Sequence, residues 1–141
     1  MDTTKRQKIS EQAGSMLDDG YHCSEAVLWA GRQLFPEYIS PQMQRLTTPF
    51  AGGIGCTAAN ICGALTGAIM VIGSGYGRQD GTSDDSECQN LAAEFHTIFE
   101  AEFGYTCCSD IKENWRGKPG QENCNILVCR TCQLLLDLLD E

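Results

Sequence analysis

Residues 58–72 are apolar on nearly every side when they are placed on a helix. A helix without a polar face is buried, so other elements have to cover it. A membrane span is the alternative, but the most apolar stretch, 61–72, is shorter than the ~20 residues that a span needs. It also contains Thr66 and two glycines. The segment therefore predicts a buried central helix, and we expect no membrane span.

Two glycines of this segment, Gly63 and Gly67, lie four residues apart and so share one face of the helix. A glycine inside a helix costs about 1 kcal/mol relative to alanine. Because glycine has no side chain, a neighbouring backbone can approach that face closely. We expect close packing there to offset the cost of the two glycines.

Apolar side chains recur at helical intervals on both sides of the central segment, which predicts amphipathic helices. One covers residues 3–19 and ends at Gly20, and a second opens at Cys23 and ends before Pro36. A short helix is expected at 41–47, and longer ones at 88–103 and at 127–139, where the last starts at Asn123 or Cys124. Residues 77–86 are predicted to be an exposed loop, and residues 104–123 an irregular loop with a helical turn at 109–112.

No alternating strand pattern and no internal repeat interrupts these segments. We therefore expect residues 1–141 to form a single all-α domain, a compact bundle of about five to six helices around the buried, glycine-containing helix. The formal net charge is -9, and the ten Lys and Arg residues are scattered. Because nucleic-acid binding depends on concentrated basic residues, no nucleic-acid partner is expected.

Nine cysteines occur in the chain, at positions 23, 56, 62, 88, 107, 108, 124, 129 and 132. Their number is odd and no cationic apolar leader precedes them, so export with complete internal disulfide pairing is not expected. We expect a cytoplasmic protein whose thiols stay reduced and available as metal ligands or as a redox pair.

Three of these cysteines lie at or near predicted helix N-termini. Cys23 and Cys124 each open a helix, and Cys62 does so unless Asn60 caps the central helix one turn earlier. Unpaired backbone N–H groups and the positive end of the helix dipole stabilise a thiolate, which makes the cysteine a better ligand or nucleophile. This placement indicates chemistry at these thiols.

The residues around the cysteines carry a longer pattern. Residues 62–67 read CGALTG, residues 23–28 read CSEAVL, and a glycine loop, FAGGIG, lies at 50–55. Further on, FGYTCC occupies 103–108 and CNILV occupies 124–128. In this order and context the chain resembles the family of redox-active proteins named for the pattern C_GCAxxG_C_C, over roughly residues 20–139.

That resemblance implies a site of four hallmark cysteines: Cys23, Cys62, Cys108 and Cys124. Cys108 is the better aligned member of its doublet, and Cys107 remains an alternative. The resemblance also implies redox activity. It extends to the split-Soret cytochromes, in which a related cysteine domain binds a two-iron cluster, so we expect an iron–sulfur cluster on these four cysteines, with electron transfer to a redox partner protein.

Two other hypotheses remain open. In a metal-free thiol–disulfide oxidoreductase, Cys62 with Cys23 or Cys124 would be the catalytic pair. In a structural zinc site, four thiolates would close a tetrahedron and form a scaffold. The sequence has no Walker loop, no dinucleotide-binding glycine fingerprint, no Ser-His-Asp arrangement and no H-E-x-x-H, which disfavours hydrolase and kinase chemistry.

The other cysteines fall outside the pattern. Cys56 is either an additional ligand or a small buried thiol without a role in the site, and Cys107 is a candidate additional ligand. Cys88 is expected in the core. The C-x-x-C formed by Cys129 and Cys132 lies inside a predicted helix with no neighbouring strand, which lacks the context of a thioredoxin-like motif. Both histidines, His22 and His96, are expected to be solvated. The apolar, glycine-rich helix offers a surface for a homodimer.

Overall fold

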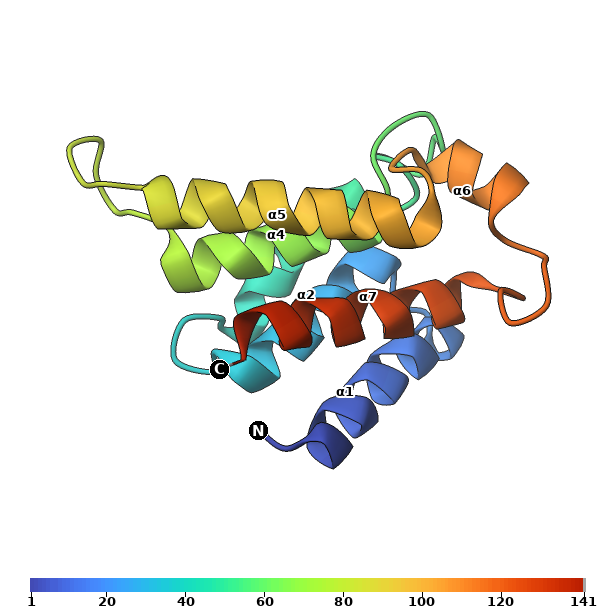
Figure 1. Ribbon diagram of the computed structural model, residues 1–141, viewed down its shortest axis with the longest axis horizontal. Coiled ribbons are helices and arrows are strands. Elements are labelled where there is room, and N and C mark those ends of the chain that lie inside the picture. Colours follow the sequence, from blue (N-terminus) through green and yellow to red (C-terminus); the bar gives the residue numbers. More distant parts are fainter. Residues whose placement is uncertain (141) are drawn as a thin grey trace.

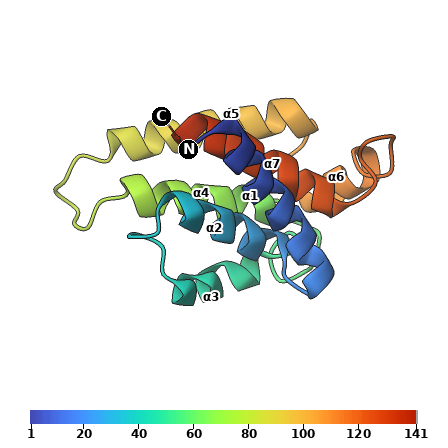
Figure 2. The same cartoon turned by 90° about the horizontal axis from the view of Figure 1, so that it is seen from below.

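The central helix predicted from the apolar segment is present and buried. The computed structural model describes residues 1–140, and in it α4 (Gly63–Tyr76) has α5 along one side and α2 and α7 on the other (Figures 1 and 2). Seven of its residues, from Gly63 to Ile72, are buried. The apolar residues of α4 thus join those of three neighbouring helices in one core.

The predicted bounds of this helix, 58–72, are wrong at both ends. The helix begins at Gly63 with Cys62 as its N-cap, because the preceding turn has left-handed backbone and includes Ala58 at φ 63°. A residue in that conformation cannot belong to a right-handed helix. At the other end the helix continues to Tyr76, and the ring of Phe35 lies against Gly75 there.

The N-terminal and C-terminal helices pack against each other and against α2. They are α1 (Thr3–Ser15), which continues as a 3₁₀ turn, η1 (Met16–Asp19), and α7 (Cys124–Leu139). Helix α2 (Cys23–Leu34) lies between α1 and α4. Gly20, at φ 91°, ends the first helical segment as predicted, and Asn123 caps α7 by accepting a hydrogen bond from the Ile126 N–H at 3.2 Å.

The predicted short helix at 41–47 consists of a 3₁₀ turn, η2 (Pro41–Met43), and α3 (Gln44–Thr47). A second 3₁₀ turn, η3 (Thr48–Phe50), continues it past Pro49. This segment fixes the start of α2, because the buried Ser24 hydroxyl donates to the Thr47 carbonyl at 2.8 Å and the Thr48 hydroxyl donates to the Glu25 carboxylate at 2.8 Å.

Helix α5 (Ser86–Phe103) matches its prediction and ends at Gly104, at φ 79°. The following segment, predicted to be irregular apart from a turn, contains a seven-residue helix, α6 (Cys108–Asn114). Burial of Ile111 and Trp115 stabilises this helix. The Trp115 ring packs edge-on against the Phe103 ring, with 5.3 Å between the ring centroids. Local spacing could not show this because the burial depends on α5.

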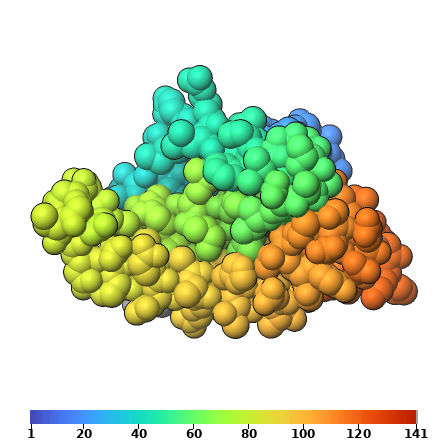
Figure 3. Space-filling model, turned by 90° about the horizontal axis from the view of Figure 1, so that it is seen from above, coloured from blue at the N-terminus to red at the C-terminus, as the bar shows by residue number. Residues whose placement is uncertain are grey.

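The all-helical prediction is confirmed: residues 1–140 contain seven α-helices, three 3₁₀ turns and no strand, only two isolated bridges. No helix in this part of the chain combines the length and the apolarity needed to cross a membrane. Figure 3 shows the glycine-containing loop before α4, in green, lying directly against the α6 region, in orange. The candidate site lies where these two segments meet α2 and α7.

Candidate functional site

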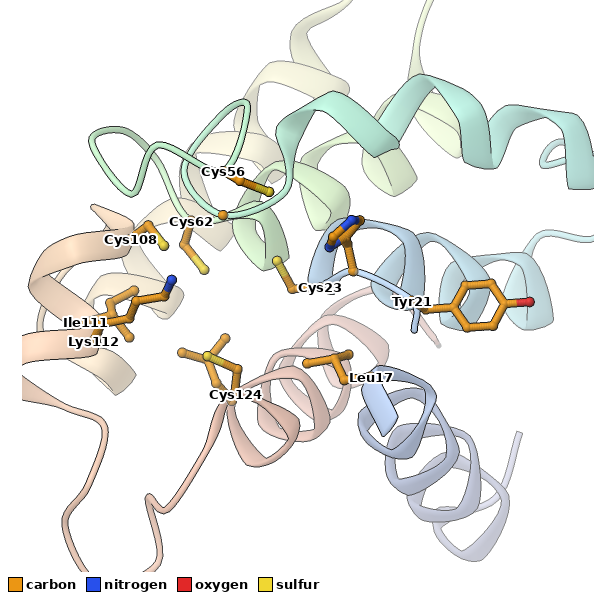
Figure 4. Close-up of a pocket in the computed structure, with 12 residues that line it drawn as sticks. Leu17, Tyr21, Cys23, Cys56, Cys62, Cys108, Ile111, Lys112 and Cys124 are labelled. Atoms are coloured by element: carbon orange, nitrogen blue, oxygen red, sulfur yellow. The ribbon is translucent and has the colours of Figure 1, made fainter. Parts of the chain in front are cut away.

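A pocket of about 340 Å³ opens between the starts of four helices, and five cysteines line it. Four of them are Cys23, Cys62, Cys108 and Cys124, here called the helix-start cysteines, and the fifth is Cys56. Apolar side chains, including Leu17, Ile111 and Leu127, form much of the remaining wall. In Figure 4 the labelled cysteines surround a common space from different elements.

Each helix-start cysteine lies at the N-terminal end of its own helix. Cys23, Cys108 and Cys124 are the first residues of α2, α6 and α7, and Cys62 is the N-cap of α4. The N-terminus of a helix carries a partial positive charge and free backbone N–H groups. Four helices therefore present to one pocket the ends that stabilise negative sulfur.

Backbone hydrogen bonds join the start of α4 to the start of α6. The Cys62 N–H donates to the Thr106 carbonyl at 2.7 Å, and the Cys108 N–H donates to the Asn60 carbonyl at 2.8 Å. The Ser109 N–H donates to the Ala58 carbonyl at 2.9 Å. Cys62 and Cys108 are thus held as neighbours by main-chain contacts, although 46 positions separate their numbers in the sequence.

Two glycines make room for pocket cysteines. A Cβ atom on Gly63 would lie 2.6 Å from the Cys23 Sγ and 2.9 Å from the Phe50 carbonyl oxygen. A Cβ atom on Gly53, which has φ 76°, would lie 2.8 Å from the Cys108 Cβ. Real Cβ atoms do not approach other atoms so closely, so these positions need glycine.

The other glycine of the CGALTG segment has a different role. A Cβ atom on Gly67 would lie 2.8 Å from the Ser24 carbonyl oxygen, so this glycine lets α4 approach the backbone of α2. The sequence predicted a close approach at the Gly63 and Gly67 face, and the structure confirms it. At Gly63 the closely approaching atoms include the Cys23 Sγ, which belongs to the site itself.

Cys23 and Cys62 interact directly. The pKa of Cys23 is lowered to about 6 despite burial, and the main cause is a hydrogen bond from the Cys62 thiol. Hydrogen bonds from the backbone N–H groups of Gly52 and Ser24 and the charge of His22 lower this pKa further. The same hydrogen bond, together with burial, raises the pKa of Cys62. The pair therefore holds one thiolate, on Cys23, next to one thiol, on Cys62.

Cys108 is buried, 6% exposed, and burial raises its pKa, while the positive charge of Lys112 acts in the opposite direction. Its neighbour Cys107 does not line the pocket. The Cys107 Sγ instead lies 3.5 Å from the Ala59 carbonyl oxygen and 3.3 Å from the Ser109 hydroxyl, whose hydrogen bond lowers the Cys107 pKa. Of the doublet, the structure places Cys108 at the pocket.

Cys56 lines the pocket from the loop before α4. It is exposed, and its backbone is left-handed, at φ 56°. Its Sγ would be 3.4 Å from a Cβ on Gly52, the residue whose N–H also interacts with Cys23. The sequence named Cys56 as an additional candidate, and no local pattern could show that its loop folds over the pocket.

The remaining cysteines and the second histidine lie elsewhere. Cys129 and Cys132 are inside α7 and do not line the pocket; Cys132 is 0% exposed, and burial raises its pKa. Cys88 is half-buried at the edge of the core and His96 is exposed. His22 is exposed too, but it lines the pocket as the N-cap residue of α2.

The part of the chain that the structure describes has no preassembled site for a single metal ion. Among residues 1–140, no three His, Cys, Asp or Glu side chains are grouped closely enough to hold one metal ion. The helix-start cysteines line a common space, as Figure 4 shows.

A protein-family model matches most of the chain. The family described as "Putative redox-active protein (C_GCAxxG_C_C)" matches residues 21–138, which include all four helix-start cysteines. No curated protein and no solved structure matches the chain.

Proposed function

Because the chain belongs to the C_GCAxxG_C_C family, described as redox-active, we propose that the cysteine pocket is its redox centre and that the four helix-start cysteines bind an iron–sulfur cluster. The observation that carries this proposal is the convergence of four cysteines, each at the start of a different helix, on one pocket. Four thiolates are the ligand set of both two-iron and four-iron clusters.

The surroundings of the four cysteines suit an anionic group. Four helix N-termini stabilise thiolate charge, and the apolar side chains of Leu17, Ile111 and Leu127 keep water away from part of the wall. When bound, an iron–sulfur cluster supplies reversible transfer of one electron. The chain's own part is to hold the sulfur atoms as thiolates and to limit access of solvent.

Four thiolates are the ligand set of a structural zinc site as well as of an iron–sulfur cluster. A structural zinc site needs its four ligands around a single point. A cluster distributes its ligands over several irons. Cys23 and Cys62, which are in contact, would provide two of the four thiolate ligands, and Cys108 and Cys124 would provide the other two.

A metal-free dithiol function is the second candidate, and the Cys23–Cys62 pair favours it. The Cys23 thiolate would attack a substrate disulfide, forming a mixed disulfide and releasing one substrate thiolate. Cys62, once deprotonated, would then attack the Cys23 sulfur, which leaves a Cys23–Cys62 disulfide and releases the second substrate thiolate. The substrate gains two electrons and the cysteine pair loses them.

Anaerobic purification followed by iron, sulfide and zinc analysis tests these alternatives. The proposal predicts a coloured protein with iron and acid-labile sulfide, because thiolate-bound iron absorbs visible light and zinc does not. Cys62→Ser is expected to lose most of the iron. Cys56→Ser is the matched control, because Cys56 lines the same pocket from a loop, and this variant should keep its iron.

Full iron content in Cys62→Ser would disprove the ligand assignment. A colourless, metal-free protein with a titratable Cys23–Cys62 dithiol would favour the second candidate. Stoichiometric zinc would favour a structural site.

A further inference from the structure

Two basic residues lie beside the pocket, Lys112 on α6 and Arg116 in the turn that follows this helix. Lys112 lines the pocket, and Figure 4 shows its side chain extending into it from α6, on the side of Cys108. The Arg116 Nη1 lies 3.8 Å from the Cys124 Sγ. The two cations thus approach two different helix-start cysteines.

Neither cation is neutralised by a carboxylate. The ion pairs within residues 1–140 involve the Met1 amino group, Arg6, Arg78 and Arg130, and none involves Lys112 or Arg116. The acidic residues on α6, Asp110 and Glu113, do not line the pocket. The charges that this segment brings to the pocket cysteines are therefore those of Lys112, which lines the pocket, and Arg116, which contacts Cys124.

We infer that Lys112 and Arg116 form a cationic wall that compensates the negative charge of the cysteine site and raises its reduction potential. This inference rests on the proposed function. Reduction adds one electron to a site already surrounded by thiolates, and a nearby positive charge favours the more negative state. The net charge around an iron–sulfur centre is one of the factors that set its potential.

The two residues should contribute unequally. Lys112 is half-buried and lines the pocket, whereas Arg116 is exposed. Solvent and salt screen an exposed charge more strongly than a partly buried one. We therefore expect the larger effect from Lys112 and a salt-sensitive one from Arg116.

Redox titration of the anaerobically purified, iron-loaded protein, followed by visible absorption, tests the inference. Lys112→Gln and Arg116→Gln should each shift the midpoint potential to more negative values. The double variant should lower the equilibrium constant for one-electron reduction about tenfold, which corresponds to ~59 mV. Lys112→Arg and Arg116→Lys, which keep the charge, should retain the potential of the unmodified protein.

Arg45→Gln is the charge-matched control, because it changes the net charge equally on α3, which contributes no residue to the pocket. Its potential should not change. Iron content of each variant serves as the second measurement. Loss of iron from both glutamine variants, with retention in the charge-preserving ones, would also support the inference, because the charge would then be needed to hold the site.

Two outcomes would overturn the inference, and they differ. An unchanged potential in the iron-replete double variant would overturn it alone. Unmodified protein without iron and sulfide would overturn it together with the proposed function.

Discussion

Two regions of helix α7 contain cysteines in opposite surroundings. Cys124 is the first residue of the helix and lines the pocket, whereas Cys132, two turns further on, is 0% exposed inside the core. Burial raises the pKa of Cys132, while at the start of α2 the pKa of Cys23 is lowered to about 6. The C-x-x-C formed by Cys129 and Cys132 lies inside the helix and does not line the pocket. Cys124 is not part of that motif, and it does line the pocket.

The difference shows that hydrogen bonds, first from the Cys62 thiol and then from backbone N–H groups, accompany the lowered pKa of Cys23. Burial raises the pKa of Cys132 and also of Cys108, although Cys108 starts a helix. At a helix start, backbone N–H groups are free to stabilise a thiolate. In the middle of a helix, those groups are already bonded, and an apolar neighbourhood favours the neutral thiol. The three predictions below test this contrast, from the largest expected effect to the smallest.

The largest effect is expected from Gly63→Ala. The added methyl group would collide with the Cys23 sulfur and with the Phe50 backbone, at 2.6 and 2.9 Å. We expect loss of most bound iron and a decrease of about 1–3 kcal/mol in the free energy of unfolding. Metal analysis and denaturant unfolding measure the two effects.

Gly73→Ala is the control for this variant, because a Cβ atom at that position of the same helix would meet nothing within 4 Å. It should keep its iron and gain about 0.5–1 kcal/mol of stability, since alanine favours a helix more than glycine does. Equal iron content in the two variants would show that Gly63 does not position Cys23.

An intermediate effect is expected in the pH dependence of alkylation of the metal-free protein. Only the thiolate reacts, so the rate at Cys23 should rise as the pH passes through about 6 and then level off. Cys132 should stay unmodified over the same range until the protein unfolds. Peptide mass spectrometry after pulses of iodoacetamide measures both rates.

Cys62→Ala sharpens this experiment. Removing the thiol that hydrogen-bonds to Cys23 should move the midpoint of the Cys23 profile upward, toward the ordinary cysteine value. A midpoint near that ordinary value in the unmodified protein would contradict the stabilised thiolate.

The smallest effect is expected from Cys132→Ala. The variant removes one buried sulfur atom and leaves a small cavity, which should cost about 1 kcal/mol in the free energy of unfolding. Iron content should stay at the level of the unmodified protein, because Cys132 lies away from the pocket. Loss of iron at full stability would instead assign the C-x-x-C a part in the site.

Much of the fold followed from local pattern. An apolar run predicted the buried α4, and periodic apolar residues predicted α1, α2, α5 and α7, because each of these helices buries a continuous stripe. The start of α4 was missed because Ala58 adopts a left-handed conformation that the composition of the segment does not indicate. Helix α6 was largely missed because Trp115 and Ile111 are buried against distant residues.

The sequence likewise predicted one part of the candidate site and missed another. Placement at helix starts and the CGALTG segment identified the helix-start cysteines as candidates. The Cys23–Gly63 contact, the Cys23–Cys62 interaction and the position of Cys56 depend on how α2, α4 and the glycine loop meet in space. Contacts between segments distant in the chain leave no periodic signal in a single sequence. Whether the four cysteines act as ligands stays a prediction.

Main-chain hydrogen bonds join the starts of α4 and α6 on one side of the pocket, whereas Cys124 lines the pocket from α7. Cys62 and Cys108 belong to one hydrogen-bonded unit, so their separation is set by the backbone. Cys124 is held instead by the start of α7, which Asn123 caps and which packs closely against Gly14 of α1. A substitution that shifts α7 on α1 would therefore move Cys124 relative to the other two cysteines, whereas the separation of Cys62 and Cys108 would be retained.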